Sequence, residues 1–194
     1  MSALAQHTLQ KPERRRVEQY ISDVFQHHHS ATLKYFLPTL FSLSDEVTIK
    51  AAIGVGPLNK EEAFLEHYLT QPVEASVSEA AQKIVARSNI AEVGNLACSC
   101  GGASRQLIAA LSEYLSDLGI EWAVFTGTSM VSVVLRRLRI ETHCLGDATP
   151  ERLGAQLSDW GTYYSHNPKV MLVNVEQAKH ATKGISKFEI EAHV

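Results

Sequence analysis

The chain has 194 residues and a mass of 21.4 kDa, which fits one globular domain. Hydrophobic residues make up 45% and charged residues 20%, so the composition excludes a disordered chain. A formal net charge of −3 gives no electrostatic reason to expect nucleic acid as a partner.

Two features of the chain indicate its cellular location. No apolar run approaches the roughly 20 residues that cross a bilayer, and the first residues lack the apolar core of a secretory signal. The three cysteines are an odd number, and Cys98 and Cys100 lie too close together for an ordinary bridge. These features predict a cytoplasmic protein without integral membrane association.

The first third of the chain predicts a helix and a hairpin. Residues 1–12 are polar and are expected to form a flexible N-terminal segment. From Glu13, apolar residues recur at helical spacing and predict an amphipathic helix. Residues 31–45 are rich in strand formers but contain a proline, and 47–55 predict a better strand. The two segments are expected to pair through a turn at 44–46.

The middle of the chain predicts two short helices, a strand and a long helix. The short helices are expected at 61–69 and at 76–83, the second capped by a serine. A strand over 83–98 follows, and Gly94 interrupts it. The long helix comes next, with a leucine-rich buried stripe, and Gly119 is expected to end it.

The last third of the chain alternates strands and helices. The apolar run at 120–126 predicts a central strand covered on both faces. The elements expected after it are a helix at 129–138, a strand at 140–145, a helix that begins at Thr149-Pro150-Glu151 and a strand at 170–175. The elements together predict one mixed α/β domain over 13–175, followed by a C-terminal tail over 176–194.

Residues 90–111 contain the strongest indication of a ligand. They predict a strand, a turn with two adjacent glycines, and a helix whose first turn carries Arg105. Glycines let the backbone approach a ligand, and a helix N-terminus offers unpaired N–H groups and partial positive charge. This pattern suits a pyrophosphate or a phosphopantetheine arm. The alternative is that Gly101 and Gly102 only make a tight turn.

Glu92 lies in an otherwise apolar strand, where a carboxylate needs a partner or a raised pKa. A bulge at Gly94 would bring Glu92 and Asn95 toward the same opening. A carboxylate beside a phosphate-binding turn is suited to deprotonating an amine next to a thioester. The alternative is that Glu92 pairs with an arginine such as Arg87 or one of residues 14–16.

Four blocks of the sequence resemble signature blocks of the thermostable hemolysin family: residues 64–69, 92–97, 101–105 and 159–164. The resemblance extends from about Pro12 to about Val173. That family is classed with GNAT-type N-acyltransferases and with acyl-homoserine lactone synthases. The resemblance therefore implies a GNAT-like fold, with a mixed, mainly antiparallel central sheet flanked by helices.

The resemblance also implies where an acyl donor would bind. In GNAT-like folds the cofactor pyrophosphate lies between the fourth strand and the next helix, which predicts a cofactor site made of Leu96, Ala97, Cys98, Cys100, Gly101, Gly102, Ala103, Ser104 and Arg105. The usual GNAT loop pattern is met only loosely, so the donor is expected to be acyl-CoA or an acyl-phosphopantetheine carrier protein. Asn95 stands where the lactone synthases have arginine, so recognition of S-adenosylmethionine is not implied.

The same resemblance suggests roles for further residues. Glu92 is expected to act as general base, with Asn95 beside it, and Tyr164 as general acid to the leaving thiolate. One of Tyr163 and Tyr164 is expected to be structural, and the sequence leaves open which. Strand-edge amides at 96–98 would support the oxyanion. The acceptor pocket is predicted to include Glu66, Tyr68 and Trp160.

Three other groups of residues have alternative interpretations. Residues 27–29 are histidines, but neighbours on a helix point about 100° apart, so they predict a solvated helix end and no metal site. Cys98 or Cys100 would alternatively be a nucleophilic thiol near the helix start. The basic residues Arg136, Arg137 and Arg139 are either a solvated face or a docking surface for an acidic carrier protein.

The resulting hypothesis is an N-acyltransferase that moves an acyl group from a CoA or carrier-protein thioester to an amine acceptor, a small molecule such as an amino acid or amine. No metal takes part in this hypothesis, and no nucleic acid is expected as partner. Two alternatives remain open: a membrane-damaging hemolysin, as the family name states, and a non-catalytic GNAT-like protein that only binds a ligand.

Overall fold

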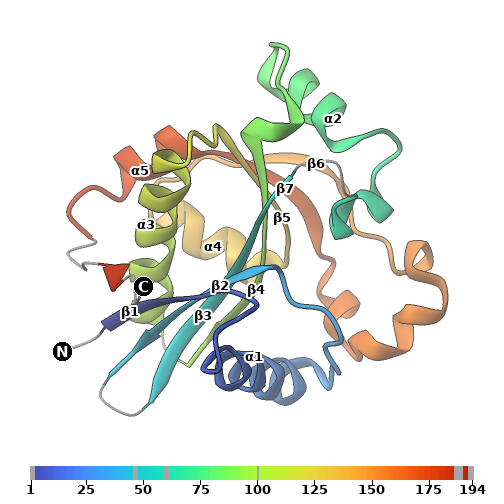
Figure 1. The fold of residues 1–194 in the computed structure, drawn as a ribbon. Coiled ribbons are helices and arrows are strands. Elements are labelled where there is room, and N and C mark those ends of the chain that lie inside the picture. The colour runs from blue at the N-terminus through green and yellow to red at the C-terminus, as the bar shows by residue number, and fades with distance from the viewer. Residues whose placement is uncertain (1–2, 46–47, 59–61, 100, 186–189, 192–194) are drawn as a thin grey trace.

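The computed structural model describes all residues except 1–2, 46–47, 59–61, 100, 186–189 and 192–194. Its centre is an eight-stranded sheet in the order β6-β7-β5-β4-β3-β2-β1-β8 (Figure 1). The strands are β1 (Ala3–His7), β2 (Thr39–Ser44), β3 (Ile49–Pro57), β4 (Ile90–Cys98), β5 (Trp122–Gly127), β6 (His143–Asp147), β7 (Lys169–Asn174) and β8 (Ile190–Glu191). β4–β5 and β1–β8 pair in parallel and the other neighbours pair antiparallel, which confirms the expected mixed, mainly antiparallel sheet.

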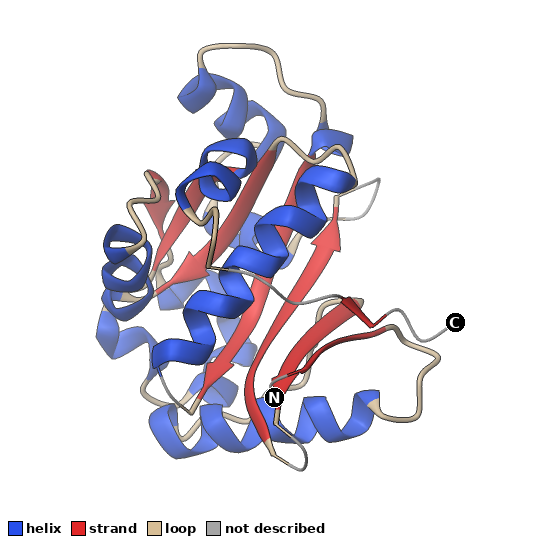
Figure 2. Ribbon diagram, turned by 90° about the vertical axis from the view of Figure 1, so that its left-hand side faces the viewer, coloured by secondary structure: helices blue, strands red, loops and turns tan. Residues whose placement is uncertain are grey.

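Helices cover both faces of this sheet. They are α1 (Arg14–His29), α2 (Val73–Ala81), α3 (Gly101–Asp117), α4 (Ser129–Arg137) and α5 (Val175–Ala181), with short 3-10 helices η1 (Phe64–Tyr68), η2 (Arg87–Asn89), η3 (Pro150–Trp160) and η4 (Tyr163–His166). Figure 2 shows the long helix α3 crossing the strands on one side. In β3, Ala52 packs with α1 while its neighbours Ala51 and Ile53 pack with α3. Because adjacent residues of a strand point to opposite faces, α1 and α3 lie on opposite sides of the sheet.

Several predicted elements are confirmed. The helix expected from Glu13 is α1, the hairpin is β2–β3, and the central strand is β5 between β4 and β7. Gly119 follows the long helix α3 with φ +74°, the left-handed conformation that lets a chain leave a helix. Part of the predicted turn at 44–46 lies outside the described residues.

The two ends of the chain differ from the sequence analysis. Ala3–His7, within the segment expected to be flexible, forms β1, which pairs with β2 and buries Leu4 to 1% exposure. The predicted tail contains most of α5 and the short strand β8, which pairs with β1. The five residues of β1 are too few to show a clear alternation of apolar and polar side chains. The strand that stabilises β1, β2, lies more than 30 residues away in sequence. The boundaries of 13–175 for the domain therefore omit two strands of the sheet.

Smaller differences have local causes. The helix expected at 76–83 is α2, which begins at Val73 directly after Pro72, with no serine as its cap. The strand expected at 83–98 begins only at Ile90 because 87–89 form η2. The segment 31–38 is not a strand: the backbone groups of Leu37 and Pro38 bind the side chains of Arg14 and Asn95 instead of a neighbouring strand.

Candidate active site

The site begins where β4 separates from β5. The parallel ladder between them ends at Val93 and Phe125, although both strands continue. On its other side, β4 shifts register against β3 between Ala52 and Gly54, and Asn95 has φ +52°. This shift inserts one extra residue into β4 at Asn95 and Leu96, so a bulge is present, but directly after Gly94 and not at Gly94 as predicted.

The bulge changes which residues of β4 face which side. Before it, Ala91 and Val93 pack on the α3 side, so Glu92 faces the opposite side of the sheet. After it, Leu96 and Cys98 pack on the α3 side and Ala97 packs with α1. The edge of β4 that faces β5 is therefore open just beyond the buried carboxylate of Glu92.

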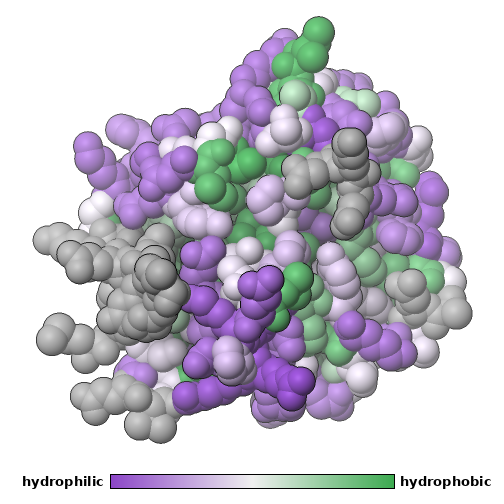
Figure 3. Space-filling view, in the orientation of Figure 1, coloured by the Kyte–Doolittle hydropathy of each residue, from purple (hydrophilic) through white to green (hydrophobic). Residues whose placement is uncertain are grey.

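A cavity of about 980 Å³ lies at this opening, and residues from both faces of the sheet line it. On the α1 side its wall, called the aromatic arm below, consists of Tyr35, Phe64, Tyr68, Trp160, Tyr163 and Tyr164. On the α3 side, its wall, called the apolar arm, includes Ile108, Leu111, Ala123, Phe125, Val131 and Leu135. Figure 3 shows apolar groups toward the middle of one face of the molecule, among hydrophilic surroundings.

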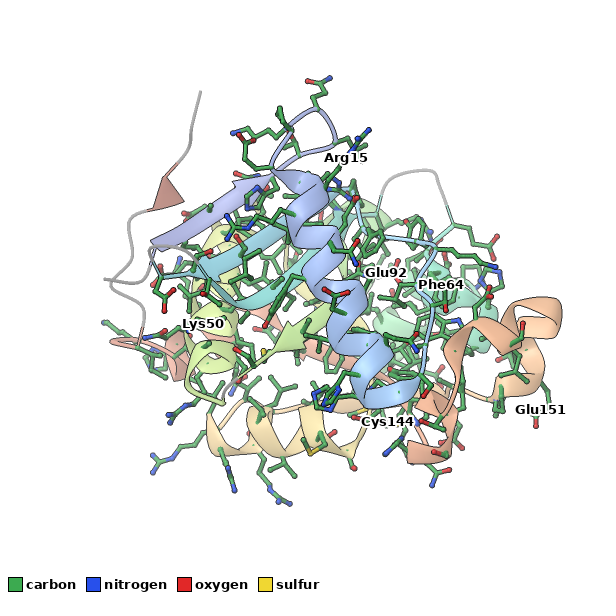
Figure 4. The ribbon with its side chains drawn as sticks, turned by 90° about the horizontal axis from the view of Figure 1, so that it is seen from below. Arg15, Lys50, Phe64, Glu92, Cys144 and Glu151 are labelled. Atoms are coloured by element: carbon green, nitrogen blue, oxygen red, sulfur yellow. The ribbon has the colours of Figure 1, made fainter. Side chains whose placement is uncertain are left out.

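Glu92 lines this cavity with only 7% of its surface exposed. Its carboxylate accepts hydrogen bonds from the backbone N–H groups of Phe64 (3.1 Å) and Leu65 (3.2 Å), and Figure 4 shows Phe64 beside Glu92. Burial raises the pKa of Glu92 to about 7, although these two hydrogen bonds act to lower it. A carboxyl group with this pKa can exchange a proton near neutral pH.

Two of the arginines proposed as alternative partners of Glu92, Arg87 and Arg14, have other contacts. Arg87 binds the carboxylates of Glu66 and Glu74. Arg14 binds Glu18 and donates to the backbone carbonyls of residues 7, 37 and 38. The hydrogen bonds of Glu92 thus come from the backbone of η1.

Two tyrosine hydroxyls meet in the aromatic arm. The hydroxyl groups of Tyr68 and Tyr164 form a hydrogen bond with each other. Burial raises the pKa of Tyr68 to about 12, and burial together with this hydrogen bond raises the pKa of Tyr164 further. Tyr163 instead donates its hydroxyl to the backbone carbonyl of Thr126 at 3.3 Å. Tyr163 therefore makes a structural contact, whereas Tyr164 is hydrogen-bonded to a second titratable group in the cavity, the hydroxyl of Tyr68.

Asn95 lines the cavity, as predicted, but its side chain is bound to the segment 35–37. Its Oδ1 accepts from the N–H of Leu37 at 2.9 Å, and its Nδ2 donates to the carbonyl of Tyr35 at 3.3 Å. Gly54 leaves room for this contact, since a Cβ there would lie 2.8 Å from Oδ1. These bonds hold the outer part of the aromatic arm against β4.

Glu66, predicted in the acceptor pocket, does not line the cavity. It forms an ion pair with Arg87 at 2.6 Å and accepts hydrogen bonds from the N–H groups of Ala63 and Val73. Burial alone would raise its pKa, but the hydrogen bonds from Arg87 and from these amides lower it to about 2. Such contacts are those of a structural ion pair, whereas Tyr68 and Trp160 do line the cavity.

The residues predicted to bind the donor lie around the start of α3. Leu96, Cys98 and Ser104 line the cavity. Gly102 and Arg105 are exposed on the first turns of α3, which begins at Gly101, and Ala97 and Ala103 are buried packing residues. Cys100 lies outside the described residues. The predicted group is therefore partly at the cavity, and its role in binding a donor stays a prediction.

Sequence analysis did not place Thr126, His29 or His166 at the site, although all three line the cavity. Thr126 lies on β5 at the opening, and within the described chain its buried hydroxyl has no hydrogen-bond partner. Thr126 lies in an apolar strand, and nothing in the sequence around it indicated a functional role. The rings of His29 and His166 lie 5.4 Å apart in the cavity lining, but no group of three metal-ligating side chains occurs among the described residues.

Comparisons with known proteins identify the fold and the family. Residues 7–179 match the family model described as thermostable hemolysin. The structure of the AHL synthase LasI has a TM-score of 0.62 at 9% identity, covering 97% of each chain. FeeM, an N-acyl amino acid synthase from uncultured soil microbes, has a TM-score of 0.62 at 12% identity, covering 94% of this chain and 96% of its own. BjaI, a CoA-dependent acyl-homoserine lactone synthase solved with SAM and isopentyl-CoA, has a TM-score of 0.63 at 11% identity, covering 97% and 94%.

No curated protein sequence matches the chain. At these identities the solved structures show a shared, GNAT-like fold. Within the described residues, no helix combines the length and apolar character needed to span a membrane.

Proposed function

The chain belongs to the thermostable hemolysin family, and on that basis and the geometry of its site we propose that it is an N-acyltransferase. It transfers an acyl group from a CoA or carrier-protein thioester to an amine. The observation that carries this proposal is Glu92: a buried carboxylate with a pKa near 7, in a cavity at the point where β4 and β5 separate.

The shape of the cavity supports binding two substrates on opposite sides of the sheet. The apolar arm offers a wall of aliphatic and aromatic side chains to an acyl chain, because burial of apolar surface is favourable. The aromatic arm, on the face of Glu92, receives the amine. The thioester carbonyl lies between them at the open edge of β4, and the phosphates of the donor extend toward the exposed start of α3.

The proposed reaction is a direct attack. Glu92 takes a proton from the bound ammonium, and the free amine nitrogen then bonds to the thioester carbonyl carbon. As the tetrahedral intermediate expels the thiolate, the second proton leaves the nitrogen and reaches the sulfur through the Tyr164 hydroxyl or water, which gives the amide and the free thiol. Backbone N–H groups at the open edge of β4 stabilise the oxyanion. Asn95 acts as a positioning residue that holds the 35–37 segment, rather than as a catalytic one.

The release of free thiol from the thioester shows which donor and which acceptor the protein uses. Purified protein is incubated with decanoyl-CoA or decanoyl acyl carrier protein and with a panel of amines, and free thiol is followed over time. We expect amine-dependent thiol release that Glu92→Gln lowers at least 100-fold. The matched variant Glu113→Gln, on the exposed side of α3, is expected to keep the activity.

A parallel measurement tests the lytic activity that the family name describes. Dye-loaded phosphatidylcholine vesicles are incubated with the protein alone, without any thioester. Leakage under these conditions, together with no amine-dependent thiol release, would contradict the acyltransferase proposal. Binding of decanoyl-CoA with neither leakage nor turnover would support the non-catalytic alternative.

A further inference from the structure

The aromatic arm is a continuous path of rings along the cavity wall, and Glu92 lies beside it. Its outer end is Tyr35, whose side chain is 55% exposed and whose ring stacks on Phe64 at 6.4 Å. The ring of Phe64 lies 5.7 Å from that of Trp160, which lies 6.0 Å from Tyr164. The backbone N–H of Phe64 binds the Glu92 carboxylate, so the residue that carries this ring is anchored at the carboxylate.

These rings and the carboxylate beside them attract the same kind of ligand. The face of an aromatic ring attracts an ammonium group within about 6 Å, and a carboxylate does so more strongly. Rings also stack against an aromatic ligand with favourable energy. The arm thus suits a protonated amine attached to an apolar or aromatic body.

The charged groups of the arm disfavour a second carboxylate. In an α-amino acid the carboxylate is attached to the carbon that carries the amine, so it would lie within about 5 Å of Glu92 once the amine is hydrogen-bonded there. The lysine in the lining, Lys34, holds its ammonium 2.8 Å from Asp159. Burial lowers the pKa of His29, and the neighbouring His166 and His28 lower it further, which favours the neutral imidazole. When Glu92 is ionised, the carboxylates of Glu92 and Asp159 outnumber the one ammonium of Lys34 in the cavity lining.

We propose that the acceptor is an aromatic or apolar primary amine without a carboxylate, such as an arylethylamine, and not an α-amino acid. This inference rests on the proposed function and names the acceptor class of the same site. It assigns recognition of the aromatic or apolar part of the amine to Phe64 and Trp160.

Matched pairs of ligands test this inference, because tyramine and tyrosine, or tryptamine and tryptophan, differ only in the carboxylate. Binding is measured by isothermal titration calorimetry with and without coenzyme A, and turnover by thiol release from decanoyl-CoA. We expect each amine to bind at least tenfold more tightly than its amino acid and to have at least tenfold higher kcat/KM. Equal or tighter binding of the amino acids, or no binding of either member, would overturn the inference.

A pair of variants shows whether the arm is responsible. Phe64→Leu removes the ring and keeps the backbone N–H that binds Glu92, so we expect it to weaken tyramine binding at least fivefold. Tyr114→Leu is the matched control, since Tyr114 is half-buried on α3, outside the cavity lining. An unchanged affinity in Phe64→Leu would contradict the inference. Tight amine binding without thiol release would reject the acyltransferase and leave the ligand class intact, whereas turnover that prefers amino acids would reject the ligand class alone.

Discussion

Glu92 has a carboxyl group whose burial makes folding depend on pH. Its pKa rises from 4.5 to about 7 in the folded protein, so the folded state holds the proton more tightly than the unfolded state. A raised pKa contributes stability that is complete below pH 4.5 and is lost as the pH rises through about 7. The full difference corresponds to about 3 kcal/mol.

The variant Glu92→Gln removes this titration. We expect the free energy of unfolding of the wild type to fall by about 3 kcal/mol relative to the variant between pH 5 and pH 8. Urea unfolding at several pH values measures this difference. In the same range, wild-type kcat/KM is expected to rise as Glu92 loses its proton. Parallel stability curves for the two proteins would contradict the assignment of the raised pKa to Glu92.

Glu66 has the opposite dependence because its ion pair with Arg87 lowers its pKa to about 2. A lowered pKa contributes stability above pH 4.5 that is lost as the pH falls toward 2. We expect Glu66→Gln to cost about 3 kcal/mol at pH 7 and to leave the KM for the amine within twofold. Glu79→Gln, an exposed glutamate on α2, is the matched control. A large rise in KM with unchanged stability would restore the predicted role in substrate binding.

The contact between the end of α1 and the segment 159–162 shows how an element shapes the cavity. The N–H of Thr162 binds the carbonyl of His29 at 2.7 Å, and the N–H of Thr32 binds the carbonyl of Asp159 at 2.7 Å. Gly161 lies between these bonds with φ +50°, and a Cβ there would come within 2.1 Å of the His29 oxygen. Only glycine fits this close approach, and the contact places Trp160 in the aromatic arm.

Gly161→Ala is therefore expected to destabilise the protein by about 3 kcal/mol or more, through backbone strain and overpacking. Gly154→Ala is a close control: its φ is +54°, but a Cβ there meets nothing within 4 Å. That variant is expected to cost only the strain, about 1–3 kcal/mol. Urea unfolding of both variants separates the two effects, and equal costs would show that the contact with α1 is unimportant.

The first turn of α3 has a glycine that the fold does not require. A Cβ on Gly102 would meet nothing within 4 Å, and alanine is a better helix former. We expect Gly102→Ala to keep or raise the stability, by up to about 1 kcal/mol, while raising the KM for decanoyl-CoA several-fold. Thermal unfolding and thiol-release kinetics measure the two effects. An unchanged KM would place the donor phosphates away from this turn.

At the scale of the whole molecule, one cavity connects the two faces of the sheet. This is possible because β4 and β5 pair only as far as Val93 and Phe125. The amine and the acyl chain can then approach one carbonyl from opposite sides. Helix α4 closes the apolar arm, and Val131 on this helix lines it.

A larger side chain on α4 should shorten the acyl chain that the protein accepts. Val131→Trp is expected to lower kcat/KM for decanoyl-CoA at least tenfold and to leave that for butanoyl-CoA within threefold. Val133→Trp, on the same helix but outside the cavity lining, is the control. Thiol release with acyl-CoA of increasing length measures the preference. Equal losses for both chain lengths would place the acyl chain elsewhere.

The elements that the sequence alone determined are those with a strong local signal. The helical spacing after Glu13, the apolar run of β5 and the glycine after α3 each act through neighbouring residues, and all three were predicted correctly. The break in β4 was predicted one residue too early: a glycine within a strand favours a bulge, but the extra residue follows Gly94, at Asn95 and Leu96. A carboxylate in an apolar strand predicted the raised pKa of Glu92, although an ion pair was an equal alternative.

Tertiary structure alone decided which groups meet. Glu92 takes its hydrogen bonds from residues 64 and 65, and Glu66 takes its arginine from position 87. Strand β1 exists because β2, more than 30 residues later, pairs with it. These contacts join residues far apart in the chain, and their free energy depends on packing and burial that arise only when the sheet closes around its core. For that reason, the local sequence pattern predicted that Glu92 lies in a strand, but only the tertiary structure determined which groups surround its carboxylate.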